Sequence, residues 1–74
     1  MINIRDEAAI KAFGLRVRQL RKDQGLSMEK LAELSGIDYR QISYVELGDT
    51  NPTISTASAI AKGLNLHIKD LFDF

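Results

Sequence analysis

Residues 27–48, SMEKLAELSGIDYRQISYVELG, contain two short amphipathic helical patterns separated by Gly36. Ser27 precedes the first pattern, where its hydroxyl can accept hydrogen bonds from the unpaired backbone N–H groups of a first helical turn. Gly36 follows the last periodic residue and can adopt the left-handed backbone that ends a helix. The stretch therefore predicts a helix that begins at Met28 and ends at Gly36.

The second pattern begins after Asp38, which can cap another helix, and Gln41 is placed to reach back in a variant of the capping box. This pattern predicts a helix from about Tyr39 to Leu47. Two short helices joined by a tight turn form a helix-turn-helix, in which the second helix lies in the major groove of DNA. The spacing therefore predicts sequence-directed DNA binding.

A helical period of about 100° per residue places Ile42 and Val45 on one face of the second predicted helix and Leu47 on the other, outward face. Guanidinium, hydroxyl and phenol groups on that outward face can address base edges or phosphates. The alternative for each residue is an ordinary solvated position on a helix, or packing at the helix N-terminus. The expected base-reading residues are Tyr39, Arg40, Ser43 and Tyr44.

Further residues spread over most of the chain complete a recognisable pattern. They are Gly14, Arg21, Leu26-Ser27, Leu31-Ala32, Gly36-Ile37, Ile42, Glu46, Gly48, Asn51-Pro52-Thr53, Ile60-Ala61 and Leu64. With them, the sequence resembles the phage-repressor (Cro/Xre-type) helix-turn-helix family, whose small stand-alone members resemble restriction-modification controller proteins and some antitoxins.

The resemblance implies an all-α, compact five-helix repressor-like DNA-binding domain in which helices 2 and 3 form the helix-turn-helix. It also implies a homodimer on a short, two-fold symmetric operator. Arg21 and Glu46 match a family pair that bridges helix 1 to the end of helix 3, and the resemblance gives them a structural role.

Contacts to the DNA backbone are expected beside the base-reading helix. The N-terminus of the helix that begins at Met28 can bind a phosphate oxygen through its backbone N–H groups. Asp38 is expected to cap its helix, and the alternative is that it accepts from the N4 amino group of cytosine. The expected backbone set is Ser27, Met28, Glu29, Thr50, Asn51 and Arg18.

The flanking segments predict three more helices, over about 6–24, 54–62 and 68–72. Apolar residues near the end of the chain exceed what one small core requires, so part of this set is expected to form a dimer surface. The alternative is that Leu71 and Phe72 only close the core. The expected dimer set is Leu66, Ile68, Leu71, Phe72 and Phe74.

Composition predicts one domain over residues 1–74, because 74 residues suffice for one modest core. There is no cysteine, no apolar run approaches the roughly 20 residues of a membrane helix, and the start MINIRDEAAI is too polar for a signal peptide. A cytoplasmic protein without membrane contact is therefore expected. The lone His67 has no neighbouring nucleophile or ligand cluster, so neither catalysis, a metal nor a cofactor is expected.

Formal net charge is zero, yet the charge is unevenly distributed. Residues 1–30 carry seven Lys or Arg against four Asp or Glu, a balance of +3, and residues 31–74 carry three against six, a balance of −3. This polarity should orient the chain on double-stranded DNA.

A rival hypothesis is an antitoxin-like module that neutralises a partner toxin and binds DNA only secondarily. Neutral net charge favours it slightly, as do Met28 and Asp49, where relatives commonly place glutamine and a basic residue. In the regulator hypothesis the partners are DNA, a second copy of the chain and, for an activator, RNA polymerase.

Overall fold

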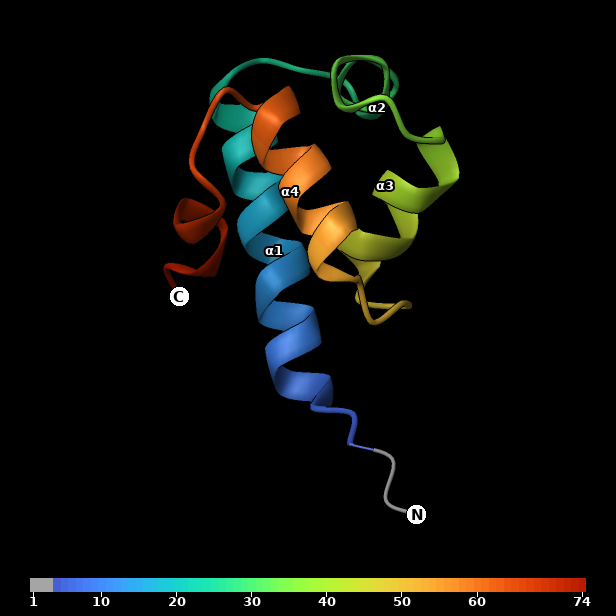
Figure 1. Ribbon diagram of the computed structural model, residues 1–74, viewed down its shortest axis with the longest axis vertical. Coiled ribbons are helices and arrows are strands. Elements are labelled where there is room, and N and C mark those ends of the chain that lie inside the picture. The colour runs from blue at the N-terminus through green and yellow to red at the C-terminus, as the bar shows by residue number, and fades with distance from the viewer. Residues whose placement is uncertain (1–3) are drawn as a thin grey trace.

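A computed structural model describes residues 4–74 of the chain. It contains four α-helices, α1 (Glu7–Asp23), α2 (Met28–Ser35), α3 (Tyr39–Leu47) and α4 (Ile54–Gly63), followed by a short 3-10 helix, η1 (Ile68–Phe72). No β-strand occurs within these residues. Helix α3 packs on α1 and α2, α2 also packs on α4, and η1 packs on α4 and α1. As a result α3 and η1 lie on opposite sides of the molecule (Figure 1).

Side-chain caps explain where the helices begin. Asp6, Ser27, Asp38 and Thr53 each precede a helix and accept a hydrogen bond from a backbone N–H of its first turn. Helix α2 ends at Gly36 with φ of 70°, so the left-handed stop expected from the sequence is confirmed. The bounds predicted for α2 and α3 agree with the structure because these local signals determine them.

The expected fifth α-helix is wrong in type, because residues 68–72 form a 3-10 helix. The N–H of Asp70 donates to the carbonyl of His67 at 3.0 Å, an i to i+3 bond. A five-residue segment is too short to gain from the α-helical pattern, whose first turn is costly to form. Smaller differences concern α1, which begins at Glu7 rather than Asp6, and α4, which extends to Gly63.

A single hydrophobic core receives side chains from all five helical elements. Leu71 of η1 is fully buried within it, with 0% of its surface exposed. Leu71 therefore has no exposed surface that a second chain could contact. Its inclusion in the expected dimer set is wrong, because its side chain closes the core. The largest fully buried side chains are Val17, Leu31, Ile42, Val45, Ile60, Leu64 and Leu71.

Within residues 4–74, no helix is both long and apolar enough to cross a membrane. Residues 1–3 lie outside the described residues, and they belong both to the stretch predicted not to be a signal peptide and to the expected 1–74 domain.

Candidate nucleic-acid interface

The outward face of α3 carries the four residues expected to read bases. Tyr39, Arg40 and Tyr44 are exposed and Ser43 is half-buried, whereas Ile42 and Val45 on the inward face are buried. The face therefore exposes one guanidinium, one aliphatic hydroxyl and two phenols to solvent. The major groove of B-DNA is wide enough to admit an α-helix that carries such groups.

Leu47 shares this face but does not belong to the expected base-reading set. It is 61% exposed at the last position of α3. Seven residues of helix return to within about 20° of the starting direction after roughly 10 Å, so Leu47 lies almost in line with Arg40. The helical period already placed Leu47 outward, but the expected set favoured hydrogen-bonding side chains. An exposed leucine here offers apolar contact of the kind that a thymine methyl group accepts.

A groove of about 150 Å³ separates α3 from the loop that leads into α4. It brings Tyr44 of the expected base-reading set together with Thr50 and Asn51 of the expected backbone set. Gln41 also lines this groove, whereas the sequence predicts that it forms a capping box with Asp38. Polar side chains from α3 and from the loop that follows it thus meet beside the outward face of α3.

The N-terminus of α2 provides the rest of the expected backbone contacts. The Ser27 hydroxyl accepts from the N–H of Lys30 at 3.0 Å, and Glu29 is exposed. The Met28 side chain is half-buried and packs against the core, so only its backbone can face a phosphate. The first N–H groups of any helix lack partners within the helix, which leaves those of Met28 and Glu29 for an anion.

Arg18, the remaining expected backbone contact, is exposed on α1. Helical spacing puts Lys11, Arg18 and Lys22 within about 20° of one direction, on the flank of α1 next to Gly14. Gly14 touches α3, and Lys11 approaches Gly48 at the end of α3. These three cations therefore form a positive stripe beside α3, and we call it the α1 stripe.

The ion pair expected between Arg21 and Glu46 is present. Nε and Nη2 of Arg21 donate to the two carboxylate oxygens of Glu46 at 2.7 and 2.9 Å, and Nη1 donates to the carbonyl of Leu26 at 2.8 Å. Both residues are only 8% exposed. The hydrogen bonds to Glu46 raise the pKa of Arg21 above its usual value, against the opposing effect of burial. The pair therefore fixes the end of α3 to α1 and to the turn before α2.

A second attachment between α1 and α3 depends on Gly14. A Cβ atom at this position would lie 2.2 Å from the carbonyl oxygen of Val45 and 3.0 Å from that of Glu46. Only glycine allows the two backbones to approach this closely. Helix α3 is thus held against α1 by a backbone contact as well as by a buried ion pair.

Asp38 joins the cap of α3 to Arg40. Its Oδ1 accepts from the backbone N–H of Arg40 at 2.7 Å and lies 3.4 Å from the Nε of the same residue. The backbone hydrogen bond, with a smaller effect of the guanidinium, lowers the pKa of the Asp38 carboxyl, which stays ionised at neutral pH.

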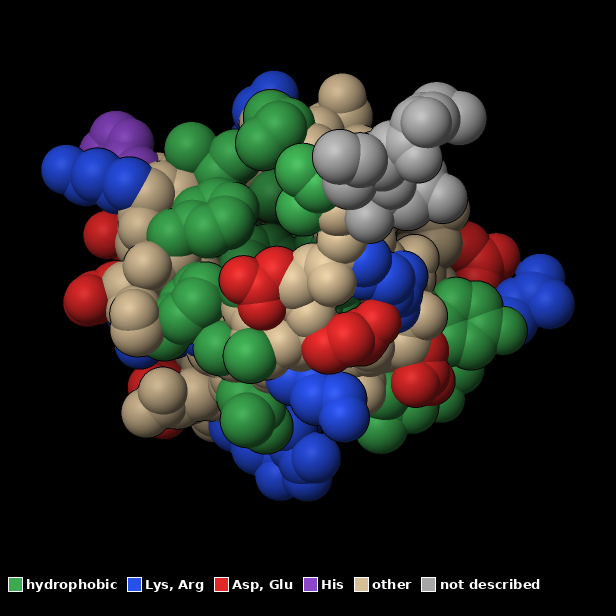
Figure 2. Space-filling view, turned by 90° about the horizontal axis from the view of Figure 1, so that it is seen from below, with side chains coloured by type: hydrophobic (Ala, Val, Ile, Leu, Met, Phe, Trp, Pro, Cys, Tyr) green, Lys and Arg blue, Asp and Glu red, His purple; other side chains and the backbone are tan. Residues whose placement is uncertain are grey.

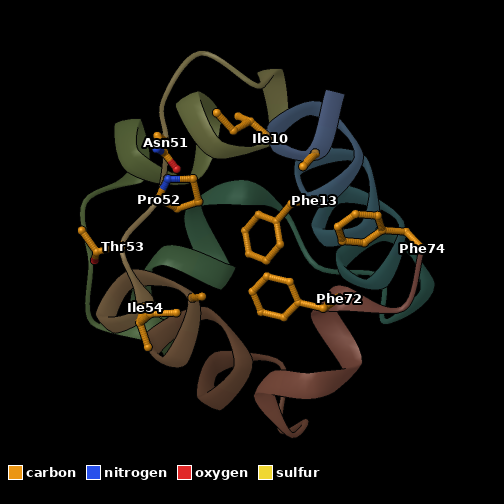
Figure 3. Close-up of a pocket in the computed structure, with 10 residues that line it drawn as sticks. Ile10, Phe13, Asn51, Pro52, Thr53, Ile54, Phe72 and Phe74 are labelled. Carbon is orange, nitrogen blue, oxygen red and sulfur yellow. The ribbon is translucent and has the colours of Figure 1, made fainter. Parts of the chain in front are cut away.

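An apolar patch lies away from α3, around the C-terminal residues. Phe72 stacks on Phe13 with ring centroids 5.0 Å apart, and Phe74 follows at 6.4 Å from Phe72 (Figure 3). These rings, with Ile10 and Ile54, line a cavity of about 200 Å³. Seen from the end at which α1 begins, a cluster of hydrophobic side chains lies on the left of the surface, and others lie at the right-hand edge (Figure 2).

The members of the expected dimer set occupy different environments around this patch. Phe72 and Phe74 are 49% and 60% exposed, whereas Leu66 and Ile68 are half-buried against the core. Ile54 is 73% exposed beside the same cavity and was missed, because no local sequence signal brings the start of α4 to the chain end. We call Ile54, Phe72 and Phe74 the C-terminal patch.

In the part of the chain that the structure describes, no three His, Cys, Asp or Glu residues group closely enough to hold a metal ion. His67 is exposed, and its backbone N–H donates to the Asp70 carboxylate at 3.1 Å.

Comparison with known proteins bears on this arrangement of helices. A family model described as helix-turn-helix (HTH_3) matches residues 17–71, a span that includes α2, α3 and α4. The chain belongs to the Xre/Cro-type helix-turn-helix family. The family model covers most of the chain, and this assignment agrees with the resemblance inferred from the residues.

Three similar proteins illustrate the range of the family. The HTH-type transcriptional regulator PuuR of Escherichia coli is 38% identical over 61 residues, which are 82% of this chain and 33% of PuuR. The chain thus spans about a third of the length of PuuR from Escherichia coli and from Shigella flexneri. Control protein C.BamHI of Bacillus amyloliquefaciens is 38% identical over 84% of this chain and 78% of its own. The crystal structure of the restriction-modification controller protein C.AhdI from Aeromonas hydrophila has a TM-score of 0.85 at 38% identity, covering 88% of this chain and 98% of that one.

Proposed function

We propose that this Xre/Cro-type chain is a transcriptional regulator that binds duplex DNA in a sequence-specific manner through α3. The observation that carries the proposal is the outward face of α3. This face carries Tyr39, Arg40, Ser43 and Tyr44, and the Arg21–Glu46 ion pair holds the helix to α1. In a helix-turn-helix this helix occupies the major groove, where base edges differ for all four base pairs. Similarity to proteins named as transcriptional regulators and controller proteins supports the same function.

Binding of the DNA backbone would come from both sides of α3. The α1 stripe supplies positive charge, and the N-terminus of α2 together with Thr50 and Asn51 supplies uncharged donors. Neutralising phosphates with cations releases counterions and favours binding at low salt. A chain of zero formal net charge can therefore still present a favourable face to DNA.

We infer that the regulator acts as a homodimer that uses the C-terminal patch. Exposed Ile54, Phe72 and Phe74 flank one apolar cavity, and a two-fold axis there would bring the same residues from both copies together. Helix α3 lies on the side of the molecule opposite η1 (Figure 1). In such a dimer the second copy would present its own α3 to the next major groove, on the order of 34 Å away. The expected operator is a short inverted repeat.

Selection of binding sites from random duplex DNA tests the proposal directly. The expected result is enrichment of an inverted repeat with half-sites about one helical turn apart, bound with an affinity that falls steeply as salt increases. Absence of any enriched sequence would contradict the proposal and would favour the antitoxin-like alternative, in which a protein is the main partner.

Arg40→Ala is expected to reduce discrimination between the selected operator and random DNA. A bidentate contact from arginine to a guanine contributes roughly 1–3 kcal/mol of discrimination, which corresponds to about 5-fold to 150-fold. Fluorescence anisotropy with both DNAs measures the ratio, and the melting temperature should not change because Arg40 is exposed. Lys62→Ala, which removes an exposed charge on α4, is the control, and equal ratios for both variants would remove Arg40 from the reading set.

Ile54→Glu is expected to dissociate the dimer. The substitution places a charge in the C-terminal patch but leaves the core unchanged, because Ile54 is 73% exposed at the first position of α4, where an acidic residue is tolerated. Sedimentation velocity should show monomer at concentrations at which the unaltered chain is dimeric. Leu47→Glu, a comparably exposed position outside the patch, should remain dimeric. A dimer that persists in Ile54→Glu would place the interface elsewhere.

A further inference from the structure

The carboxylate of Asp38 makes two interactions with one residue, Arg40. A single oxygen, Oδ1, accepts the backbone N–H of Arg40 at 2.7 Å and approaches its Nε to 3.4 Å. The first interaction is the N-cap of α3, so the position of the carboxylate is fixed by the helix itself. The guanidinium therefore lies beside a defined point at the N-terminal end of α3, the end whose residues contact base edges in this motif.

Occupation of Nε has a chemical consequence for the rest of the guanidinium. Arginine carries five N–H donors in a planar fork, and Nε has one of them. With Asp38 beside Nε, the outer pair Nη1 and Nη2 makes no hydrogen bond within the described residues, and this pair can meet O6 and N7 of one guanine. An arginine without this attachment would have to give up more side-chain freedom on binding.

Capping alone does not require an aspartate. Asparagine caps helices as well as aspartate does, yet it carries no charge and attracts a guanidinium less strongly. The charge also has a cost at a DNA-binding surface, because a carboxylate repels phosphates. Both side chains are well exposed, 54% for Asp38 and 75% for Arg40, so this carboxylate would face DNA directly.

We propose that Asp38 is a positioning residue for specificity, which orients Arg40 toward a guanine and lowers affinity for DNA that lacks that guanine. This inference rests on the proposed function, since it concerns how α3 reads DNA. Removing the charge should act in opposite directions on two measurable quantities, because affinity for random DNA should increase as discrimination decreases.

Asp38→Asn in the full chain tests the inference, because it preserves the cap and removes the charge. Three duplexes are compared at one salt concentration: the selected operator, the same operator with the Arg40-dependent guanine replaced, and a random sequence. Asp38→Asn is expected to lower discrimination at that guanine by about 2-fold to 5-fold, the effect of an exposed ion pair, and to strengthen binding to random DNA. The melting temperature should be unchanged.

Two further variants distinguish positioning from other roles. In an Arg40→Ala background, Asp38→Asn should cause no additional loss of discrimination, because there is no guanidinium left to orient. Asp49→Asn removes another exposed carboxylate near α3 that makes no contact with Arg40, and it should strengthen binding to all three duplexes equally.

The possible failures are separable. Loss of discrimination that persists in the Arg40→Ala background would mean that Asp38 contacts a base itself, and it would overturn the positioning role. Unchanged discrimination in Asp38→Asn would overturn the inference but leave sequence-specific binding intact. If the unaltered chain selects no sequence from random DNA, the proposed function fails and this inference fails with it.

Discussion

Glu46→Ala is expected to destabilise the fold by about 3–5 kcal/mol, because it leaves the buried guanidinium of Arg21 without its partner. Small domains have total stabilities of about 5–15 kcal/mol, so a loss of this size removes a large share of the whole. The change also releases the end of α3 from α1. Urea denaturation followed by circular dichroism measures the loss as a lower transition midpoint.

Two comparisons make this result interpretable. Glu33→Ala removes a carboxylate that is 72% exposed and paired with Lys30, so it should alter stability by no more than about 0.5 kcal/mol. Arg21→Met combined with Glu46→Leu removes both charges and should be more stable than Glu46→Ala alone, because no unpaired buried charge remains. If Glu46→Ala cost no more than Glu33→Ala, the pair would not stabilise the fold.

Gly14→Ala is expected to destabilise the chain even though alanine is the better helix former. The added Cβ would lie 2.2 Å from the Val45 carbonyl oxygen, a backbone atom that can move only if α3 moves. Alanine gains about 1 kcal/mol of helix propensity, but overpacking costs about 1–3 kcal/mol and more where backbones collide. The expected net loss is about 2 kcal/mol.

Thermal unfolding decides the sign for Gly14→Ala, and operator binding should weaken in parallel because α3 is displaced. Gln19→Ala, on the exposed side of α1 away from the core, should leave the melting temperature almost unchanged. A Gly14→Ala variant that melts higher than the unaltered chain would mean that α1 and α3 are not in close backbone contact.

The parts of the fold that follow from local chemistry could be predicted from the sequence. Ser27, Asp38 and Thr53 cap helices within three residues of themselves, and Gly36 ends α2 through its own backbone angle. The inward and outward faces of α3 follow from the helical period, because nine residues form more than two turns. These signals need no knowledge of the tertiary structure.

The errors and omissions concern segments whose environment depends on distant residues. Five residues before the chain end do not reveal whether they form an α-helix or a 3-10 helix, nor that Leu71 points into the core while Phe72 does not. Ile54 joins the C-terminal patch only because α4 brings it beside residues almost twenty positions later. The contact of Asp38 with the Arg40 side chain likewise depends on a rotamer that spacing does not specify.

One consequence follows from the way in which α3 is attached. Ile42, Val45 and Glu46 hold the helix from the inside, whereas Arg40, Tyr44 and Leu47 are exposed and absent from the core. Stability and the proposed recognition of DNA thus lie on different sides of one nine-residue helix. Duplicated copies of such a gene can diverge in the outward positions and acquire separate operators, while each copy keeps an unaltered interior.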